Sequence, residues 1–430
     1  MHSSLNSREQ SNFDAIAQSN SQQYYNRSRH FHKSFNSIFV AMTPNSNPEL
    51  VRSIQHRIEN APDRRISFAD YMETVLYHPQ HGYYSRGAKF GAGGDFVTST
   101  HLSADFGEML AKQLRQMWEI LGKPKPFSIV EMGAGQGILA VDLLKYLQRE
   151  AFGCFEAIEY VIVETSSSLR SHQKQIQGAN LRWCDWEEIP DSSIVGCFLS
   201  NELVDAFPVH RIAVEGGQLQ EIYTTLDESG AFREVTGELS APRLRSYFDF
   251  VGIDPSHFRE GYRTEVNLQA LSWMETVANK LDRGYVLTVD YGYEARRYYA
   301  IGRSRGTLQC YCQHRYHDDP YTAIGEQDIT AHVDFTALQR QGDACGLTTE
   351  GFTQQGLFLM ALGLGERLAE LGQENRPATG QEIIDIMQRR QVLHSLIDPM
   401  GLGGFGVLVQ SKGLESDRDR LKGLTPPPMF

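Results

Sequence analysis

The feature that most constrains the fold is a glycine-rich segment between an apolar run and a helical pattern. The apolar run Ser128–Met132 leads into Gly133-Ala-Gly-Gln-Gly137, and Ile138–Arg149 follows with helical spacing of its apolar residues. Glycines at such a junction let a ligand approach the backbone, where the start of a helix supplies free N–H groups. The spacing is G-x-G-x-G rather than the G-x-G-x-x-G of dinucleotide-binding enzymes, because Ile138 takes the sixth position. The segment therefore predicts a ligand-binding strand–turn–helix unit.

Strand and helix patterns alternate along the central part of the chain. Four further strands and three helices are predicted there: strands at 159–164, 181–184, 193–199 and 284–290, and helices at 103–121, 166–177 and 267–281. Apolar runs without polar alternation, interleaved with helices, are typical of a parallel sheet that is covered on both faces. We therefore predict an α/β fold built on a doubly wound, Rossmann-like sheet.

The pattern changes after Pro208, where polar residues become frequent. The elements expected here are a β-hairpin over 209–225, an irregular insertion over 228–262, a long polar loop over 294–334, and late strands at 352–359 and 405–410 around a helix at 379–395. We expect this part to contribute an inserted α+β region on the substrate side of the sheet.

These patterns divide the 430 residues into six regions. They are a disordered leader at 1–47, an N-terminal helical cap region at 48–125, the first half of the ligand-binding core at 126–208, an inserted β-hairpin and substrate region at 209–265, the second half of the core at 266–413, and a loose tail at 414–430. Ser, Asn and Gln supply 21 of the first 47 residues, a composition too polar to form a core. The leader is interpreted as a disordered tail, a segment upstream of a true start at Met42, or an organelle transit peptide.

Charge and composition exclude several classes of protein. A formal net charge of −12 argues against nucleic-acid binding, which needs a basic surface, and is compatible with a cationic substrate. No apolar run approaches the roughly 18 residues of a membrane helix, so no membrane span is expected. Six cysteines are too few for a disulfide framework in a chain this long, which favours a reducing compartment. We predict a cytoplasmic protein, or one of an organellar matrix if the leader is a transit peptide.

Two acidic residues indicate which ligand the glycine loop binds. Glu131 precedes the first glycine, where it would repel a pyrophosphate and attract an ammonium group. Glu164 ends the next strand, where a carboxylate can accept hydrogen bonds from both ribose hydroxyls of a nucleoside. A ligand with a ribose, an amino group and no phosphate fits S-adenosylmethionine (SAM), and the predicted cofactor residues are Glu131, Gly133, Gly135, Gly137 and Glu164. The alternatives are a structural turn with a solvated Glu164, and a nucleotide site.

Asp185 and Trp186 follow the third predicted strand. In this topology the position lies beside the base of the ligand, where Asp185 can accept a hydrogen bond from an exocyclic amine. The alternative places Trp186 in the core and Asp185 at a helix cap.

One cluster resembles a metal site: Cys310, Cys312, His314 and His317. It lacks the C-x₂₋₄-C pairing of zinc sites, so no metal is predicted.

The segment Ser200–His210 follows the fourth strand, at the sheet edge where catalytic groups of open α/β folds gather. Methyl transfer needs a nucleophile held close to the methyl donor, so positioning contributes much of the rate. A guanidinium nucleophile is protonated at ordinary pH, and carboxylates must grip two of its nitrogens. Glu202 and Asp205 are the candidate catalytic pair, and Asn201 is a candidate to hold substrate or cofactor. The alternative makes Asp205 a turn cap and leaves Glu202 solvated.

Taken together, six segments resemble the MidA-like methyltransferases, a family that includes the mitochondrial complex I assembly factor that methylates arginine. The segments are Tyr77–Tyr84 (YHPQHGYY), Gly94–Ser99 (GDFVTS), Glu131–Gly137 (EMGAGQG), Ser200–His210 (SNELVDAFPVH), Asp290–Gly292 (DYG) and Asp328–Phe335 (DITAHVDF). The resemblance covers roughly Ile66 to Gly413. It implies a class I SAM-dependent methyltransferase fold with an added substrate-side domain. It also implies that Gly133, Gly135 and Glu164 hold the cofactor, and that a segment with Gly94 and Asp95 closes over it.

The predicted function is SAM-dependent methyl transfer to an arginine of a partner protein. The resemblance implies symmetric dimethylation of a protein arginine, and a respiratory complex subunit as the kind of partner. The alternatives are SAM-dependent methylation of a small molecule, and a non-catalytic assembly factor that retains the fold. The intact pair of Glu131 and Glu164 argues against the non-catalytic alternative.

Overall fold

The computed structural model describes residues 46–86, 99–174, 180–312, 315–371, 380–415 and 418–426. The chain from Ser46 onward forms one compact unit, and the predicted leader up to Asn45 lies outside the described residues. Two large sheets, one mainly parallel and one antiparallel, organise this unit.

The main sheet has the strand order β16-β17-β10-β5-β2-β3-β4. Its strands are β2 (Phe127–Met132), β3 (Ile158–Val163), β4 (Leu181–Cys184), β5 (Ile194–Asn201), β10 (Leu281–Asp290), β16 (Thr348–Gln354) and β17 (Gly406–Lys412). The strands from β10 to β4 are parallel, and β17 is antiparallel to both of its neighbours. The predicted α/β fold is confirmed. The order reverses between β2 and β5, which is where open α/β sheets bind ligands.

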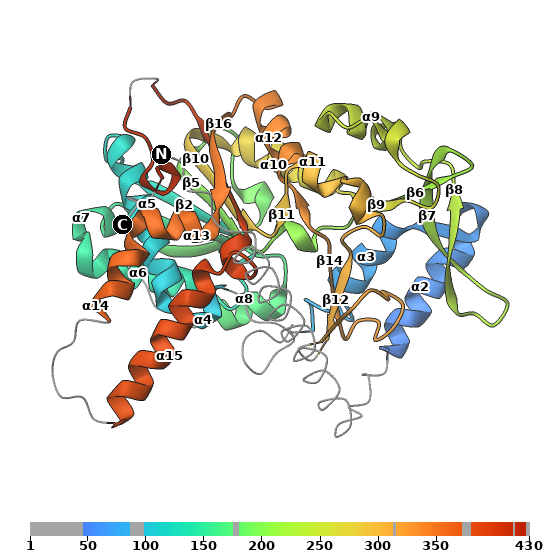
Figure 1. Cartoon of the computed structure of the whole chain (residues 1–430), viewed down its shortest axis with the longest axis horizontal. Coiled ribbons are helices and arrows are strands. Elements are labelled where there is room, and N and C mark those ends of the chain that lie inside the picture. The colour runs from blue at the N-terminus through green and yellow to red at the C-terminus, as the bar shows by residue number, and fades with distance from the viewer. Residues whose placement is uncertain are drawn as a thin grey trace, which may run out of the picture. The chain divides into compact units, whose positions relative to one another are not determined.

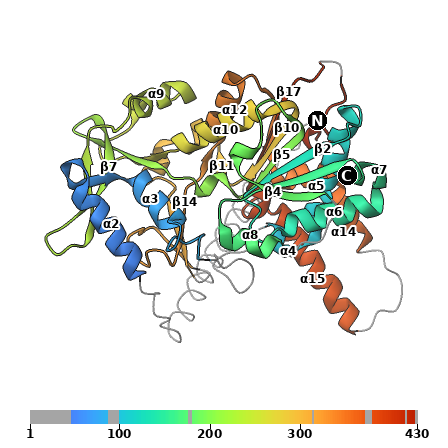
Figure 2. The same cartoon turned by 180° about the vertical axis from the view of Figure 1, so that it is seen from behind.

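Helices cover both faces of the main sheet (Figures 1 and 2). One core contains residues of α5 (Ala104–Ile120), α6 (Ile138–Glu150), α13 (Gln355–Leu359) and α15 (Gly380–Ile397), and the other contains residues of α10 (Leu268–Lys280) and α12 (Phe335–Ala344). Adjacent residues of β2 separate between the cores, Ile129 into the first and Val130 into the second. The alternating direction of strand side chains thus explains why these strands are apolar throughout.

Shorter helices connect the elements of this layer. They are α4 (Ser99–Leu102), α7 (Phe152–Phe155), α8 (Ser167–Gln173) and α14 (Gly365–Glu370), with the 3₁₀ turns η3 (Val204–Ala206) and η7 (Leu402–Gly404) at the ends of β5 and before β17.

The second sheet is antiparallel, with the order β1-β7-β6-β9 and β8 paired to β7. Its strands are β1 (Arg65–Ser67), β6 (His210–Glu215), β7 (Gln218–Leu226), β8 (Phe232–Gly237) and β9 (Arg263–Val266). The predicted hairpin is β6–β7, which turns at Gly216 and Gly217, both with positive φ. The helices α2 (Pro48–Asn60), α3 (Phe68–Tyr77) and α9 (Pro242–Val251) share cores with this sheet.

The predicted cap region 48–125 is divided between the two sheets. Ile66 of β1 pairs with Thr224 of β7, so α2 and α3 belong to the second sheet, whereas α5 packs on the main one. Asn47, assigned to the leader from the sequence, caps α2 by accepting from the N–H groups of Glu49 and Leu50. The structured chain therefore begins before residue 48.

Two of the predictions for the polar regions are wrong. The predicted irregular stretch 228–262 contains β8 and α9, because Leu244, Tyr247, Phe248 and Val251 recur at helical spacing and are buried. The predicted loop 294–334 contains the helix α11 (Ala295–Tyr298) and the strands β12 (Gln309–Cys312), β13 (Arg315–His317), β14 (Asp328–Thr330) and β15 (Val333–Asp334). Strand β15 pairs with β11 (Gly292–Tyr293), which lies just before the predicted loop. Strands this short carry too little periodicity to be recognised.

Two further predictions fail near the C-terminus. The predicted strand 352–359 ends as β16 at Gln354, and α13 begins at the next residue, because a short apolar run is compatible with either structure. The tail 414–430 is not loose at Leu421 and Leu424, which are buried in the core of the main sheet.

Candidate active site

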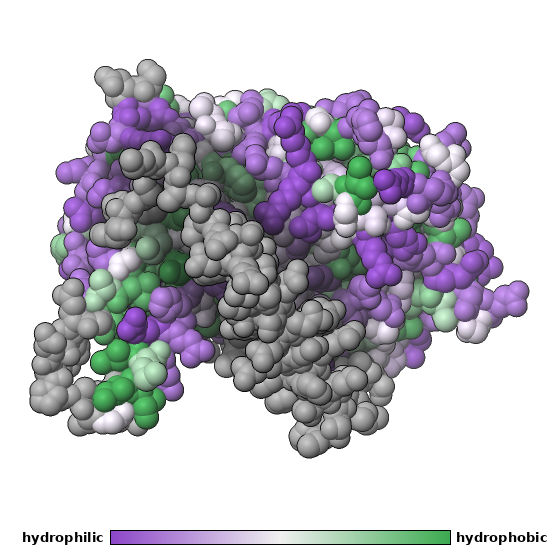
Figure 3. Space-filling view, in the orientation of Figure 1, coloured by the Kyte–Doolittle hydropathy of each residue, from purple (hydrophilic) through white to green (hydrophobic). Residues whose placement is uncertain are grey.

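A cavity of about 1090 Å³ opens at the carboxyl ends of β2, β3 and β5, between the main sheet and α3, β12 and β14. Figure 3 shows this face of the molecule hollowed near its centre, with hydrophilic residues around the hollow. Catalytic and cofactor sites of doubly wound folds lie at this edge of the sheet. The sequence-predicted residues Glu131, Gly133, Gly135, Glu164 and Glu202 all line this one cavity, and so do Trp186, Asn201 and Asp205.

The glycine loop adopts the backbone that its sequence predicts. Gly133, Gly135 and Gly137 have φ of 67°, 54° and 75°, a left-handed region that side chains disfavour. A Cβ at Gly133 would lie 2.6 Å from Cδ1 of Leu203, whereas one at Gly135 would meet no atom within 4 Å. Gly137 does not line the cavity but is the N-cap of α6. The loop thus leaves an open space against bare backbone, which fits a ligand lying across it.

The two acids of the predicted cofactor site are buried at the cavity. Glu131 accepts a 2.6 Å hydrogen bond from the Tyr160 hydroxyl, and burial raises the pKa of its carboxyl to about 7. Glu164 accepts from Ser166 N at 2.8 Å and from Gln173 Nε2 at 3.1 Å, and burial raises its pKa as well. Neither carboxylate makes a salt bridge with a described residue. Both fit a cationic, hydroxyl-bearing ligand, which would compensate their charge.

Gln173 is a residue of this site that the sequence did not single out. Its side chain is fully buried and donates to Glu164 and, at 2.8 Å, to the carbonyl of Gly135, while its own oxygen accepts from Trp183 Nε1 at 3.0 Å. It therefore fixes the glycine loop, the acid after β3, and β4 relative to one another. A lone glutamine in a polar helix gives no sequence signal for such a role.

Asp185 and Trp186 have different surroundings in the structure. Trp186 lines the cavity and stacks on Phe198 with the ring centroids 6.2 Å apart. Asp185 is absent from the described lining, its carboxylate pairs with Arg170 at 2.6 Å, and its side chain is 55% exposed. The structure thus offers no support for Asp185 beside the ligand's base, because an ion pair holds it at the surface. Gly94 and Asp95 lie outside the described residues.

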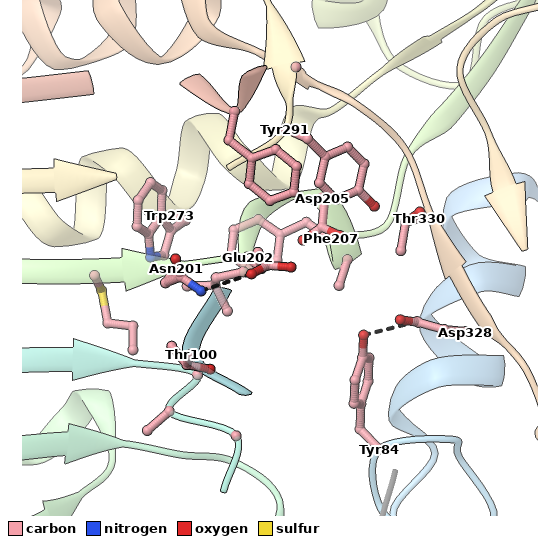
Figure 4. A pocket seen from close by; sticks show the side chains of 18 of the residues that line it. Tyr84, Thr100, Asn201, Glu202, Asp205, Phe207, Trp273, Tyr291, Asp328 and Thr330 are labelled. Atoms are coloured by element: carbon pink, nitrogen blue, oxygen red, sulfur yellow. Dashed lines mark hydrogen bonds between the residues drawn. The ribbon is translucent and has the colours of Figure 1, made fainter. Parts of the chain in front are cut away.

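Asn201, Glu202 and Asp205 lie together where β5 ends (Figure 4). Glu202 has a φ of 51°, a strained conformation for a residue other than glycine. Its Oε1 accepts hydrogen bonds from Asn201 Nδ2 at 3.1 Å and from Ser99 N at 3.2 Å. Burial in the cavity walls, followed by repulsion from Asp205, raises the pKa of Glu202 to about 8. The strained turn therefore presents an acid that readily holds a proton.

A third carboxylate, Asp290 at the end of β10, organises this turn from behind. Its Oδ2 accepts from the backbone N–H groups of Leu203, Val204 and Asp205, at 3.2, 2.9 and 3.4 Å. Burial, then the charges of Asp205 and Glu202, hold its pKa well above the usual range. The DYG segment of the sequence contains this residue, but its role becomes visible only when β10 and β5 are neighbours.

Aromatic side chains form the wall opposite the carboxylates. Tyr77 and Tyr84 stack at 5.4 Å, with hydroxyls that donate to the Ala206 carbonyl at 2.8 Å and to Asp328 Oδ1 at 2.9 Å. Figure 4 shows Tyr84 and Asp328 on one side of the space and Glu202 on the other. The buried Oδ1 of Asp205 has no hydrogen-bond partner in the described part of the chain. The walls thus suit a flat, cationic group with several N–H donors.

Two further features lie outside the candidate site. His210, the last residue of the segment Ser200–His210, pairs with the buried Glu221 at 2.8 Å in the second sheet. Within the described ranges no cluster of His, Cys, Asp or Glu could hold a metal ion, and His314 is outside them. No helix among the described residues is long and apolar enough to cross a membrane.

Three comparisons agree with this geometry. Residues 109–353 match a family described as "Putative S-adenosyl-L-methionine-dependent methyltransferase". A crystal structure described as a "COG1565 superfamily member and likely methyl transferase" from Burkholderia thailandensis, bound to S-adenosyl-homocysteine, is 31% identical, covers 89% of this chain and 97% of its own, and superposes with a TM-score of 0.77. The Drosophila melanogaster protein arginine methyltransferase NDUFAF7 homolog, mitochondrial, is 31% identical over 79% of each chain, and the human NDUFAF7 protein 26% over 87% of each. The chain therefore belongs to the MidA-like family of SAM-dependent methyltransferases.

Proposed function

We propose that this methyltransferase modifies an arginine side chain of a partner protein. The observation that carries the proposal is the carboxylate cluster of Glu202, Asp205 and Asp290, which makes no salt bridge with any described residue. Carboxylates that are buried, as in Asp205 and Asp290, or partly buried, as in Glu202, are unfavourable without a counter-charge, and their raised pKa values express that cost. A guanidinium bound between Glu202 and Asp205, which both line the cavity, would supply the missing charge and several N–H donors.

Two carboxyl oxygens at the cavity are available as acceptors. Glu202 uses Oε1 for Asn201 and Ser99, which leaves Oε2 for a substrate. Oδ1 of Asp205 has no hydrogen-bond partner in the described part of the chain, although Tyr291 interacts with the same carboxyl group. A guanidinium is planar and carries five N–H donors, so it can bridge two carboxylates. The stacked pair Tyr77 and Tyr84 would receive its apolar stem and its flat face.

The residues at the glycine loop fit SAM, which supplies an electrophilic methyl group when bound. Glu131, Gly133, Gly135 and Glu164 would hold it, with Gln173 fixing the loop and the acid. The arginine nitrogen that gains the methyl group loses one proton, and the substrate keeps a single positive charge. Glu202 has the proton affinity at neutral pH to receive that proton and to release it to solvent.

The relatives that are named protein arginine methyltransferases support the acceptor type. A respiratory complex subunit is then the kind of partner we propose. The same relatives are named mitochondrial, which supports an organellar matrix as the compartment and a transit-peptide role for the leader.

The test is to identify what receives the methyl group. Purified protein, isotope-labelled SAM and a lysate of cells that lack this protein are incubated together, and labelled proteins and small molecules are mapped by mass spectrometry. We expect label on arginine of one or a few proteins, lost with Asp205→Asn while binding of S-adenosyl-homocysteine persists. Label only on a small molecule would favour the small-molecule alternative. Cofactor binding with no labelled product would favour a non-catalytic assembly factor.

A further inference from the structure

An arginine cluster lies beside the cavity of this acidic protein. Four arginines occur within ten residues, at 296, 297, 303 and 305, although the whole chain has a net charge of −12. Arg297 and its neighbour Tyr293 line the cavity. Elsewhere, arginines with half-buried or buried side chains pair with acids, as Arg211 does with Glu234, and Arg367 does with Asp105 and Glu108. None of the four makes a salt bridge or a side-chain hydrogen bond with any residue that the structure describes.

Tyr293 holds two of these arginines in place. The Cζ atoms of Arg297 and Arg303 lie 4.2 and 4.1 Å from the centroid of its ring. A guanidinium that stacks on a ring uses its face, so its N–H donors, which lie in its plane, remain free at the edge. The two like charges are within about a Debye length of each other, so they repel one another unless an anion lies between or beside them.

The charges of Arg297 and Arg303 act on a residue that lines the cavity. His332 lines the cavity and contacts both Tyr291 and Tyr293, with ring centroids 5.3 Å apart in each case. Burial, then the charges of Arg303 and Arg297, lowers the pKa of its imidazole to about 4. The rim of the cavity is therefore positive, whereas the interior is acidic through Asp205 and Glu202, the second of which becomes negative only when it gives up its proton.

We propose that Arg297 and Arg303 form an anion-recognising rim that selects an arginine with acidic residues close to it in the partner protein. This inference rests on the proposed function and names the substrate class of the same site. The cationic side chain enters the acidic interior, and Asp or Glu side chains a few residues away bind the guanidinium edges at the rim. A substrate arginine embedded in a basic stretch would instead be repelled by the same rim.

The test uses three synthetic peptides, each with one central arginine flanked on both sides by two aspartates, two serines or two lysines. Binding is titrated with S-adenosyl-homocysteine present, at low and at high salt. We expect the acidic peptide to bind about tenfold tighter than the neutral one at low salt, with the lysine peptide weakest and the differences shrinking at high salt.

Variants assign the preference to the rim. Arg297→Gln with Arg303→Gln should bring the ratio of acidic to neutral peptide affinity close to one, and Arg297→Glu with Arg303→Glu should reverse it. The control, Arg245→Glu with Arg390→Glu, changes the net charge equally at two exposed positions outside the lining of this cavity and should keep the ratio. Calorimetry of S-adenosyl-homocysteine binding and thermal melting show whether each variant is folded.

The possible results separate the two proposals. Equal binding of the three peptides, or a ratio unchanged in the glutamine double variant, overturns the rim and leaves arginine methylation standing. Failure of every peptide to bind contradicts both proposals. Preferential binding of the wild type to vesicles of anionic lipid, lost in the double variant while the peptides show no preference, would reassign the rim to a membrane surface and overturn the peptide proposal.

Discussion

Glu202 combines a strained backbone with a carboxyl that burial keeps protonated up to a pKa of about 8, against 4.5 for an ordinary glutamate. A group whose pKa is raised on folding favours the folded state below its unfolded pKa, and that contribution is lost as the pH rises through the folded pKa. We therefore expect Glu202→Gln to raise the melting temperature of the ligand-free protein at pH 8.5 by about 1–3 °C. At pH 5 the wild-type carboxyl is already neutral, and the two proteins should melt together.

The exposed Glu275 of α10 is the control for this prediction, because Glu275→Gln removes a charge in contact with water. Its effect on melting should not depend on pH. A Glu202→Gln effect of equal size at pH 5 and at pH 8.5 would contradict the assigned pKa. Ionisation of Glu202 should lower stability but strengthen binding of the arginine acceptor, because only the charged carboxylate attracts a guanidinium. Affinity for an arginine peptide should therefore rise between pH 6.5 and 9.

The substitution Gly133→Ala tests whether the glycine loop needs both a left-handed backbone conformation and the absence of a side chain at this position. An alanine there must adopt a φ near 67° and place its Cβ 2.6 Å from Leu203 Cδ1. Gly122, with a φ of 81° and no atom within 4 Å of its Cβ position, is the matched control. Both substitutions should cost about 1–2 kcal/mol for the backbone. Only Gly133→Ala should also displace Leu203 and weaken S-adenosyl-homocysteine binding, by roughly tenfold or more in calorimetry.

The residues of the candidate site that could be predicted are those that directly follow a strand in the sequence. Glu131, Gly133, Glu164, Glu202 and Asp205 each stand at or after a strand end, and parallel strands bring such ends to one edge, so all of them line the cavity. Their roles stay predictions. Gln173 and Asp290 were out of reach, because a buried amide and a supporting carboxylate show their function only through partners far away in the sequence. The ion pair of Asp185 could not be predicted for the same reason, since its partner Arg170 lies on another element. The place of Asp185 beside the ligand's base stays a prediction.

At the scale of elements, the turn η3 depends on β10 as much as on its own residues. Oδ2 of Asp290 accepts from three consecutive backbone N–H groups of this turn, and Oδ1 accepts from Tyr291 N at 2.9 Å. In Asp290→Asn only one of the two oxygens remains as an acceptor. Either the N–H groups of the turn or the N–H group of Tyr291 must then face the NH₂ group of the amide, which cannot accept a hydrogen bond. We expect a loss of about 1–3 kcal/mol in unfolding free energy and a larger loss of arginine-peptide binding, measured by denaturant titration and calorimetry.

Asp227, at the exposed end of β7, provides the comparison for Asp290. Its Oδ1 accepts from Ser229 N at 2.8 Å and Ala231 N at 2.9 Å, in a turn remote from the cavity lining. Asp227→Asn should reduce stability slightly and leave peptide binding intact. If Asp290→Asn behaves in the same way, Asp290 does not position the turn that carries Asp205.

Long elements could be predicted and short ones could not. The strands β2, β3, β5 and β10 of the main sheet carry apolar runs, and their predicted starts and ends lie within a few residues of the observed ones. The strands β12, β13 and β14 have three or four residues each and obtain their hydrogen bonds from one another, so no local pattern marks them. The helix α9 was missed although its apolar spacing is regular, because the polar residues around it dominate the composition.

At the scale of the whole molecule, the second sheet and the adjoining wall of the cavity combine segments that are far apart in the sequence. Strand β1 and helices α2 and α3 precede the main sheet in the chain, yet they complete the second sheet, where Arg65–Ser67 pairs with β7 and Thr225 Oγ1 donates to the Arg64 carbonyl at 2.7 Å. From α3, Tyr77 reaches the cavity and donates to the Ala206 carbonyl, next to Asp205. The side of the cavity proposed to bind the methyl acceptor therefore depends on residues from 46 onward, which the order of the strands in the sequence could not have placed there.

This organisation predicts where the chain can be shortened. A protein that begins at Met42 keeps Ser46 and Asn47, whose contacts with Ile324 and with the start of α2 tie the N-terminus to the compact unit. We expect its melting temperature, S-adenosyl-homocysteine affinity and methyl transfer to equal those of the full chain. A protein that begins at residue 68 lacks α2 and β1, leaves the edge of β7 and the apolar face of α3 uncovered, and should aggregate or melt at least 10 °C lower. The intermediate case, a start at Pro48, removes the Asn47 cap together with the hydrogen bonds of Ser46 and Asn47 to Ile324, and should cost at least about 1 kcal/mol. A chain from residue 68 that melts and methylates like the full protein would show that the N-terminal segment is an independent addition, and the two-sheet origin of the acceptor site would then be wrong.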